Sequence, residues 1–168
     1  MTFHANITDD LMISRVENAP FFVDDLFASK FADKTPHYGH HIICFYRKDW
    51  RHFIPLSYTN FLPYHEVIVV GGAMTDGAVF RMMPAETRNI IKQSGGIYYQ
   101  LLKFAFKALQ DECEAFFGYA GDRRAYEIDI RAGFEPTPHQ YLIANFHKPV
   151  SDQRKKELIE KIHALGPF

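Results

Sequence analysis

Glu66-Val67-Ile68-Val69-Val70-Gly71-Gly72 is the stretch that decides the fold of this 168-residue chain. Its four consecutive apolar residues, three of them valine, predict a strand. Because no polar residue alternates with them, both faces of that strand are expected to be buried. Such a strand needs cover above and below its sheet. The stretch therefore predicts a central strand over 66–72 in a layered domain.

A strongly patterned helix is expected downstream, over 97–110. Nearly all of its surface is apolar, which indicates packing on most sides. Its polar side chains form one narrow stripe: Gln100, Lys103, Lys107 and Gln110. A short strand over 115–119 follows. A strand, a crossover helix and a second strand make a parallel unit, so we expect the strands at 66–72 and 115–119 to run parallel.

Earlier segments predict a helix opening near Pro20 and two neighbouring strands. The run over 40–47 is β-branched and aromatic, and the run over 51–58 is weaker. Adjacent strands joined by a short turn favour antiparallel pairing. Pro55, which lacks a backbone N–H, favours an edge or a bulge in the second strand.

The C-terminal third predicts two more helices around a last strand over 139–147. Asp122 is expected to cap a helix over 123–132, and Gly133 to end it. An amphipathic helix over about 151–165, capped by Ser151, closes the chain. The residues expected to face inward on it are Leu158, Ile162 and Leu165.

These elements predict one α+β domain over 1–168. We expect three layers, α/β/α, around a mixed and largely antiparallel central sheet. A short helix over 84–92 stands between the central strand and the packed helix. No internal repeat or linker divides the chain.

The composition restricts the class of function. Hydrophobic residues make up 47% and charged residues 23%, with a net charge of −1, which is typical of a globular protein without a basic surface for nucleic acid. No apolar run approaches the roughly 20 residues that span a bilayer. Met1–Asp10 carries no secretory signal pattern. We therefore predict a cytoplasmic protein with no nucleic-acid or membrane partner, and leave a homodimer open.

The sequence predicts no metal site. Cys44 and Cys113 have neither metal-ligand spacing nor the density of a disulfide scaffold, which favours a reducing compartment. His40 and His41 are adjacent and alternate faces in a strand, so they do not converge.

Two glycine-bearing segments are candidate anion sites. Over 71–77 the glycine separation matches a P-loop, but Ala78 and Val79 follow where Lys and Ser or Thr would bind phosphate and magnesium. We exclude a nucleoside triphosphatase and expect a turn or an opening at the strand end. Over 93–98 the glycines precede a helix whose first N–H groups and dipole attract anions. The alternative is that they only separate two helices.

The late segment Asp122-Arg123-Arg124-Ala125-Tyr126-Glu127-Ile128-Asp129-Ile130-Arg131-Ala132-Gly133-Phe134-Glu135 resembles that of the GNAT N-acetyltransferases. In that family a strand precedes a polar residue, a short helix, Gly-Phe and the last strands. Working backward, 93–96 resembles the loop that cradles the coenzyme A pyrophosphate. The resemblance spans about residues 40–148.

The resemblance implies a set of coenzyme-binding residues: Gln93, Ser94, Gly95, Gly96, Ile97, Tyr98 and Asp122. Tyr98 departs from the family pattern, because a small Gly or Ala usually stands at its position. The family's thiolate-protonating Tyr falls on Asp129, and Tyr126 lies three positions earlier. The segment 78–92 is an insertion relative to the family.

Acetyl transfer to an amine needs a base for the amine proton and a donor for the thiolate. Asp129, beside small side chains, is our candidate donor, because burial would raise its pKa. The alternative is a solvated carboxylate paired with Arg124 or Arg131. The base candidates are His65, Glu66 and Asp76. Glu66 is the first choice, because it begins the strand that carries the family's acyl-binding groove.

The resemblance implies an acyl-CoA-dependent N-acyltransferase. Acetyl-CoA or another acyl-CoA would be the co-substrate, without a metal, and the acceptor would be an amine of a small molecule or peptide. A non-catalytic module that binds a CoA ligand, or regulates through it, is the alternative. A third interpretation is an interaction protein that has lost the ligand.

Overall fold

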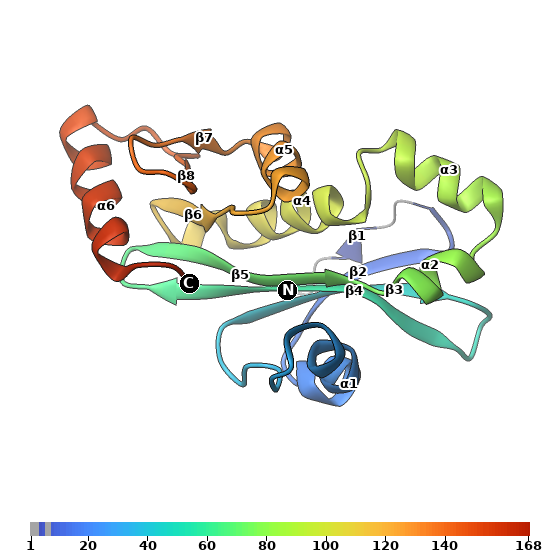
Figure 1. The fold of residues 1–168 in the computed structure, drawn as a ribbon. Helices are drawn as coiled ribbons and strands as arrows, with labels where there is room; N and C mark the ends of the chain where they lie inside the picture. The colour runs from blue at the N-terminus through green and yellow to red at the C-terminus, as the bar shows by residue number, and fades with distance from the viewer. Residues whose placement is uncertain (1–3, 6–7) are drawn as a thin grey trace.

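A computed structural model describes residues 4–5 and 8–168. The interpretation of Met1–Asp10 as lacking a secretory signal therefore falls partly outside the described residues. Within them, eight strands form one sheet in the order β1-β2-β3-β4-β5-β6-β8-β7. Every neighbouring pair is antiparallel except β5 and β6, which are parallel. The predicted mixed, largely antiparallel sheet is confirmed (Figure 1).

The elements have the following bounds. The strands are β1 (His4–Ala5), β2 (Leu11–Val16), β3 (His40–Arg47), β4 (Phe53–Tyr64), β5 (Val67–Thr75), β6 (Ala115–Tyr119), β7 (Glu135–Pro136) and β8 (Leu142–Asn145). The α-helices are α1 (Ala19–Phe31), α2 (Gly77–Met82), α3 (Ala85–Gln93), α4 (Ile97–Leu109), α5 (Arg123–Ala132) and α6 (Asp152–Leu165).

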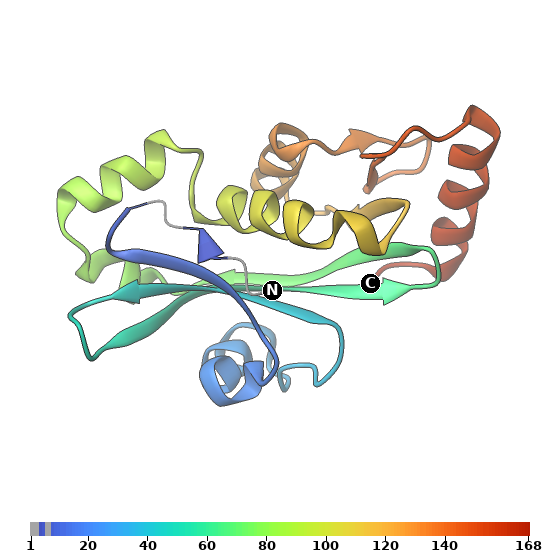
Figure 2. The same cartoon turned by 180° about the vertical axis from the view of Figure 1, so that it is seen from behind.

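The three predicted layers are present. Figures 1 and 2 show α1 on one side of the sheet and α4 along the other. Ile68 and Phe116 belong to the core on the α4 side, and Ile43 and Tyr58 to the core on the α1 side. The strand β5 lies between β4 and β6 and is buried over Val67–Val70, as its apolar run predicts. The strand order and the burial of β5 confirm the prediction that the segment 66–72 forms a central strand.

The central strand is longer than expected: of the two alternatives predicted over 71–77, a turn or an opening at the strand end, the structure shows the opening. β5 continues through Gly71 and Gly72 to Thr75. A Cβ atom at Gly71 would overlap the side-chain amide of Asn60 on β4, so glycine serves close strand packing there. Asp76 then caps α2, accepting backbone N–H bonds from Ala78 at 2.7 Å and Val79 at 3.1 Å.

Helix ends follow the predicted capping chemistry. The Asp122 carboxylate accepts the Ala125 N–H at 2.9 Å, and Gly133 ends α5 with φ at +122°. The Ser151 hydroxyl accepts the Arg154 N–H at 3.2 Å at the start of α6. Leu165 is 41% exposed, so the prediction that it faces inward is wrong and the buried face of α6 ends at Ile162.

Other strand boundaries differ from the sequence pattern. The strand β2 was not predicted, and the strand expected over 139–147 is confined to β8. Residues before β8 form a turn in which the Thr137 hydroxyl donates to the Leu142 carbonyl at 2.8 Å, and Tyr141 has a φ of +66°. Pro55 lies opposite Phe45, next to a register shift between β3 and β4, which confirms the predicted bulge.

The parallel pair β5 and β6 is short, and this positions the site. Pairing runs only from Val67 opposite Ala115 to Val69 opposite Phe117. Beyond Val69, β5 continues to Thr75 without pairing to β6. The sheet therefore opens between these two strands. In the part of the chain that the structure describes, no helix is both long and apolar enough to cross a bilayer.

Candidate active site

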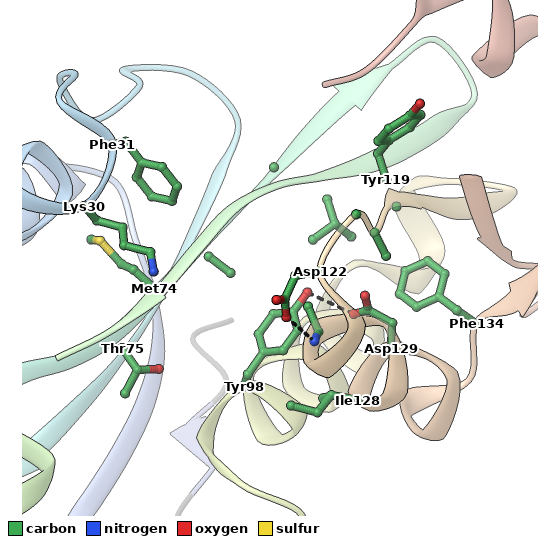
Figure 3. Close-up of a pocket in the computed structure, with 17 residues that line it drawn as sticks. Lys30, Phe31, Met74, Thr75, Tyr98, Tyr119, Asp122, Ile128, Asp129 and Phe134 are labelled. Carbon is green, nitrogen blue, oxygen red and sulfur yellow. Dashed lines mark hydrogen bonds between the residues drawn. The ribbon is translucent and has the colours of Figure 1, made fainter. Parts of the chain in front are cut away.

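A cavity of about 560 Å³ lies in the opening between β5 and β6. β5 lines it from Val70 to Thr75, and the end of β6 with the following loop lines it from Gly118 to Asp122. Tyr98 at the start of α4 and Asp129 on α5 close one side. Figure 3 shows these two on the opposite side of β5 from Lys30 and Phe31 at the end of α1. The cavity therefore reaches through the sheet opening and has two distinct sides.

Tyr98 and Asp129 form the polar centre of this cavity. The Tyr98 hydroxyl donates a hydrogen bond to Asp129 Oδ1 at 3.0 Å (Figure 3). Asp129 is only 5% exposed. The bond joins the first turn of α4 to the interior face of α5, which also presents Ala125 and Ile128 to the cavity. A buried carboxyl group is thus held in place at the wall of a cavity.

Burial changes the protonation of both groups. It raises the pKa of Asp129 from 3.8 to about 6, and the hydrogen bond from Tyr98 opposes that rise. Burial also raises the pKa of Tyr98 far above its ordinary value, and the neighbouring Asp129 charge adds to the effect. At neutral pH the carboxyl is therefore mostly ionised and the phenol keeps its proton. The carboxyl titrates in the range useful for proton transfer.

The predicted alternative for Asp129, a solvated ion pair, is not what the structure shows. Arg131 instead donates from Nη2 to the Gly95 carbonyl at 3.2 Å, and its guanidinium lies 5.8 Å from the centre of the Tyr99 ring. Arg124 lines a different surface cavity along the outer face of α5. Asp129 is buried and bound to Tyr98, as a proton-handling role requires.

The predicted anion-binding loop lies at the N-terminus of α4. Gly95 and Gly96 both have positive φ values, +100° and +94°, which glycine adopts without strain. Gln93 ends α3 and Ser94 follows as its C-cap. Ile97 begins α4, and among the described residues no side chain caps this helix. Its first N–H groups are free for a ligand.

Three features of this loop bear on the predicted anion site. A Cβ atom at Gly96 would meet nothing within 4 Å, so the surface there is open. Tyr98 does not crowd the loop, because its hydroxyl reaches across to Asp129. The bond from Arg131 to Gly95 also brings a positive charge beside the loop. The loop is therefore a positively polarised edge next to the cavity.

The other two predicted site residues at α5, Asp122 and Tyr126, face different cavities. Asp122 caps α5 and lines the cavity with Asp129. Tyr126 lines the outer surface cavity with Arg124 and Arg131 instead. The spacing alone did not establish this, because residues three apart on a helix are neighbours; the packing around α5 separates the two side chains.

Glu66, our first candidate for the base, lies elsewhere. Its carboxylate is bound by Lys161 at 2.9 Å and by Arg154 at 3.1 Å, both on α6. The Lys161 hydrogen bond is the main cause of its lowered pKa. Glu66 also precedes β5 at the end away from the opening and does not line the cavity. The structure does not bring Glu66 together with Asp129 at the cavity.

The remaining base candidates are also held outside the cavity. His65 has a φ of +51° in the turn before β5 and packs edge-on against Tyr64, with ring centres 4.7 Å apart. Asp76 is the cap of α2. Among the described residues, the ionisable side chains that line the cavity are Lys30, Tyr98, Tyr119, Asp122 and Asp129.

Sequence patterns did not identify several cavity residues. Lys30 and Phe31 come from α1, which the sequence predicted only as a helix. Tyr119 was expected only as a strand residue; it lines the cavity from the end of β6, and its ring centre lies 6.1 Å from those of Tyr141 and Phe168. No local signal marks these positions, because the sheet opening brings them together. Within the residues that the structure describes, no group of three metal-ligating side chains converges.

Among the described strands, the one parallel pair of a mixed sheet separates over a cavity, beside a helix N-terminus that no side chain caps. Solved structures of N-acetyltransferases share this fold. A proposed N-acetyltransferase from Lactobacillus plantarum matches with a TM-score of 0.52 at 12% identity, covering 82% of this chain and 98% of its own. The chain therefore has the GNAT fold.

Two further structures agree. The ribosomal-protein-S5-alanine acetyltransferase from Vibrio fischeri has a TM-score of 0.50 at 8% identity, covering 89% of this chain and 100% of its own. AtaTR bound with AcCoA has a TM-score of 0.50 at 12% identity, covering 93% and 99%. No protein-family model matches the sequence, and no curated protein matches it. At these identities the likeness concerns the fold.

Proposed function

We propose that this protein is an acyl-CoA-dependent N-acyltransferase that moves an acetyl or similar acyl group to a primary amine. The thioester would lie in the opening between β5 and β6, where β5 lacks its parallel partner. The acceptor amine would meet the thioester within the same cavity, on the side that Tyr98 and Asp129 line. Attack then needs no covalent enzyme intermediate, because the groove holds both reactants.

The observation that carries this proposal is the position of Asp129. It is a buried carboxyl group with a pKa of about 6, at the wall of a cavity that lies next to a free helix N-terminus. The resemblance to the GNAT family places it where relatives carry the residue that protonates the leaving thiolate. A carboxyl that is partly protonated near neutral pH has the chemistry for that step.

The coenzyme would be held by the loop at the start of α4. The N–H groups of Ile97, Tyr98 and Tyr99 would bind the pyrophosphate, with Arg131 adding positive charge. Gly96 would allow the phosphates to approach the backbone closely. A structure with similar fold, AtaTR, holds AcCoA, which supports the choice of ligand.

A non-catalytic module that binds a CoA ligand is the second candidate function. The observation that favours it is the pair of departures from the family pattern, Tyr98 and Asp129, at the centre of the cavity. Such a module would keep the coenzyme-binding loop but would not catalyse acyl transfer.

In the catalytic case the acceptor would be a small molecule or peptide. The cytoplasm, which the buried free thiols of Cys44 and Cys113 favour, stays a prediction.

The test combines binding and turnover. Melting temperature is measured with acetyl-CoA, with CoA and with nucleotides that lack the pantetheine arm, since a ligand of the native state raises it. Thiol release from acetyl-CoA is then followed with a panel of primary amines. Stabilisation by acetyl-CoA with amine-dependent thiol release supports the transferase. Stabilisation without thiol release selects the module, and no stabilisation by either coenzyme contradicts both.

A further inference from the structure

The proposed transferase needs a group that takes the proton of the acceptor amine, and the cavity offers few. Glu66, His65 and Asp76 lie outside it. Within the described residues the carboxylates that line it are Asp122 and Asp129. Asp122 is engaged as the cap of α5. The base must therefore belong to the Tyr98–Asp129 pair itself. This inference rests on the proposed transferase function.

The hydrogen bond between the two residues has a definite direction. The Tyr98 hydroxyl donates to Asp129 Oδ1 at 3.0 Å, so the lone pairs of the phenolic oxygen are free to accept an N–H from a bound amine. Burial fixes this direction at neutral pH, because it raises the pKa of Tyr98 well above that of Asp129. In this arrangement the phenolic oxygen of Tyr98 can accept a proton while it passes its own proton to the ionised carboxylate of Asp129.

We propose that Tyr98 and Asp129 form a two-residue proton relay that first takes a proton from the acceptor amine and then returns it to the leaving sulfur. The two side chains face the same cavity from two different helices, within hydrogen-bond distance. Tyr98 touches the reacting amine and is the catalytic residue. Asp129 acts through it as the proton store.

The steps balance without any other reactant. The nitrogen of the neutral amine attacks the thioester carbonyl carbon, and its proton passes to the Tyr98 oxygen as the Tyr98 proton passes to Asp129 Oδ1. The C–N bond forms, the C–S bond breaks and its electron pair goes to sulfur. The proton then returns from Asp129 through Tyr98 to the thiolate. The products are the amide and the coenzyme thiol.

The charged and titratable groups around the relay are few. Lys30 comes from the end of α1, Tyr119 from β6 and Asp122 from the start of α5. Asp122 accepts the N–H of Ala125, and Tyr119 packs on Tyr141 and Phe168. Asp129 is thus the one carboxylate of the described cavity lining that is both buried and bound to a hydroxyl.

The experiment is a double-mutant cycle on the full chain. Thiol release from acetyl-CoA is measured from pH 5 to 9 with the best amine of the panel or, if none stands out, with ethylamine at high concentration. The variants are Tyr98→Phe, Asp129→Asn and the double variant, with Tyr64→Phe as the matched control on a tyrosine that does not line the cavity. Acetyl-CoA binding is measured for each variant by calorimetry.

The relay predicts a specific pattern. Each single variant lowers kcat/KM by roughly 10²–10⁴, and the double variant is about as slow as the slower single, since both residues serve one proton path. The acidic limb of the parent profile lies near pH 6. In Tyr98→Phe the residual activity rises at higher pH than in the parent, because the hydrogen bond that lowers the Asp129 pKa is gone.

Several outcomes overturn the relay. Tyr98→Phe within about 3-fold of the parent, with Asp129→Asn slow, leaves Asp129 alone in the mechanism and keeps the proposed function. If the loss of kcat/KM in the double variant equals the product of the two single losses, Tyr98 and Asp129 act independently and do not form a relay. If the parent binds acetyl-CoA but releases no thiol, both the relay and the transferase fail and the module remains. A loss of acetyl-CoA binding in Tyr98→Phe assigns Tyr98 to binding and overturns its catalytic role.

Discussion

Val69 lies opposite Phe117 in the last parallel pair between β5 and β6, and beyond this pair the two strands separate. The cavity begins next to this point, at Val70 on one strand and Gly118 on the other. The opening therefore follows from a short parallel ladder within an otherwise continuous sheet. A groove formed by separated strands exposes backbone N–H and C=O groups, which a bound chain-like ligand such as pantetheine can use.

Filling this opening should block the ligand. Ala73 lines the cavity from β5, so Ala73→Phe places a ring where the thioester is expected. We expect acetyl-CoA affinity to fall roughly tenfold or more, which corresponds to about 1.4 kcal/mol. The matched control is Ala78→Phe on the exposed surface of α2. Titration calorimetry measures both, and equal affinity for the two variants would place the thioester elsewhere.

The loop at the start of α4 is tested by charge. Gly96 has a φ of +94°, so Gly96→Ala and Gly96→Asp carry the same backbone strain. Only the aspartate adds a negative charge beside the expected pyrophosphate. We expect Gly96→Asp to bind acetyl-CoA more weakly than Gly96→Ala by roughly tenfold at low salt, and the difference to shrink as salt screens it. Identical affinities would remove the loop from the binding site.

The raised pKa of Asp129 has a consequence for stability. Its folded pKa of about 6 exceeds the unfolded value of 3.8, so the folded state binds the proton more tightly. The free energy of unfolding should therefore fall as pH rises from about 4 to 6, by roughly 3 kcal/mol at most. Asp129→Asn cannot ionise, so it does not lose this stability. Its free energy of unfolding should exceed that of the parent at pH 7.5 and differ little from it at pH 4.

Urea unfolding at the two pH values measures this effect. Asp152→Asn, in the exposed first turn of α6, is the control that changes a carboxylate without the buried environment. A stability gain in Asp129→Asn at pH 7.5 combined with lost turnover would mean that the site keeps a destabilising group for function. Equal stability of parent and variant at both pH values would contradict the burial of the charge.

Glu66 gives the opposite pH signature. Its pKa is lowered below 4.5, chiefly by the hydrogen bond from Lys161, so the interaction stabilises the fold above that pH and is lost as pH falls further. We expect Glu66→Gln to lower the melting temperature slightly at pH 7, and the difference from the parent to shrink as the pH falls below 4.5. Thiol release should stay within about 2-fold of the parent. A 100-fold loss of turnover with intact binding would restore Glu66 as the base.

The sequence predicted the fold through its most regular segments. The apolar run at Val67–Val70, the narrow polar stripe of α4 and the caps at Asp122 and Gly133 each carry a local signal that survives in the structure. The strand at 139–147 was overestimated because Tyr141 adopts positive φ in a turn, which a tyrosine gives no reason to expect. β5 was cut short because glycine was taken as a strand end.

The candidate site was predictable only in part. The sequence singled out Asp129 as a candidate by its place on α5, and the loop before α4 by its glycines; both stay predictions. The partner of Asp129 was not predictable, because Tyr98 lies 31 residues away on another helix, and their contact depends on how α4 and α5 pack. The position of Glu66 outside the cavity was not predictable for the same reason, because its hydrogen bond with Lys161 on α6 joins residues 95 positions apart in the sequence.

Binding of acetyl-CoA tests the central claim most directly, because both the transferase and the relay depend on it. The measurement is a calorimetric titration of the parent protein with acetyl-CoA, repeated with Gly96→Asp. We predict saturable one-to-one binding to the parent and markedly weaker binding to the variant. No heat of binding from a folded parent, or equal binding by both proteins, would contradict an acyl-CoA site between β5, β6 and the start of α4.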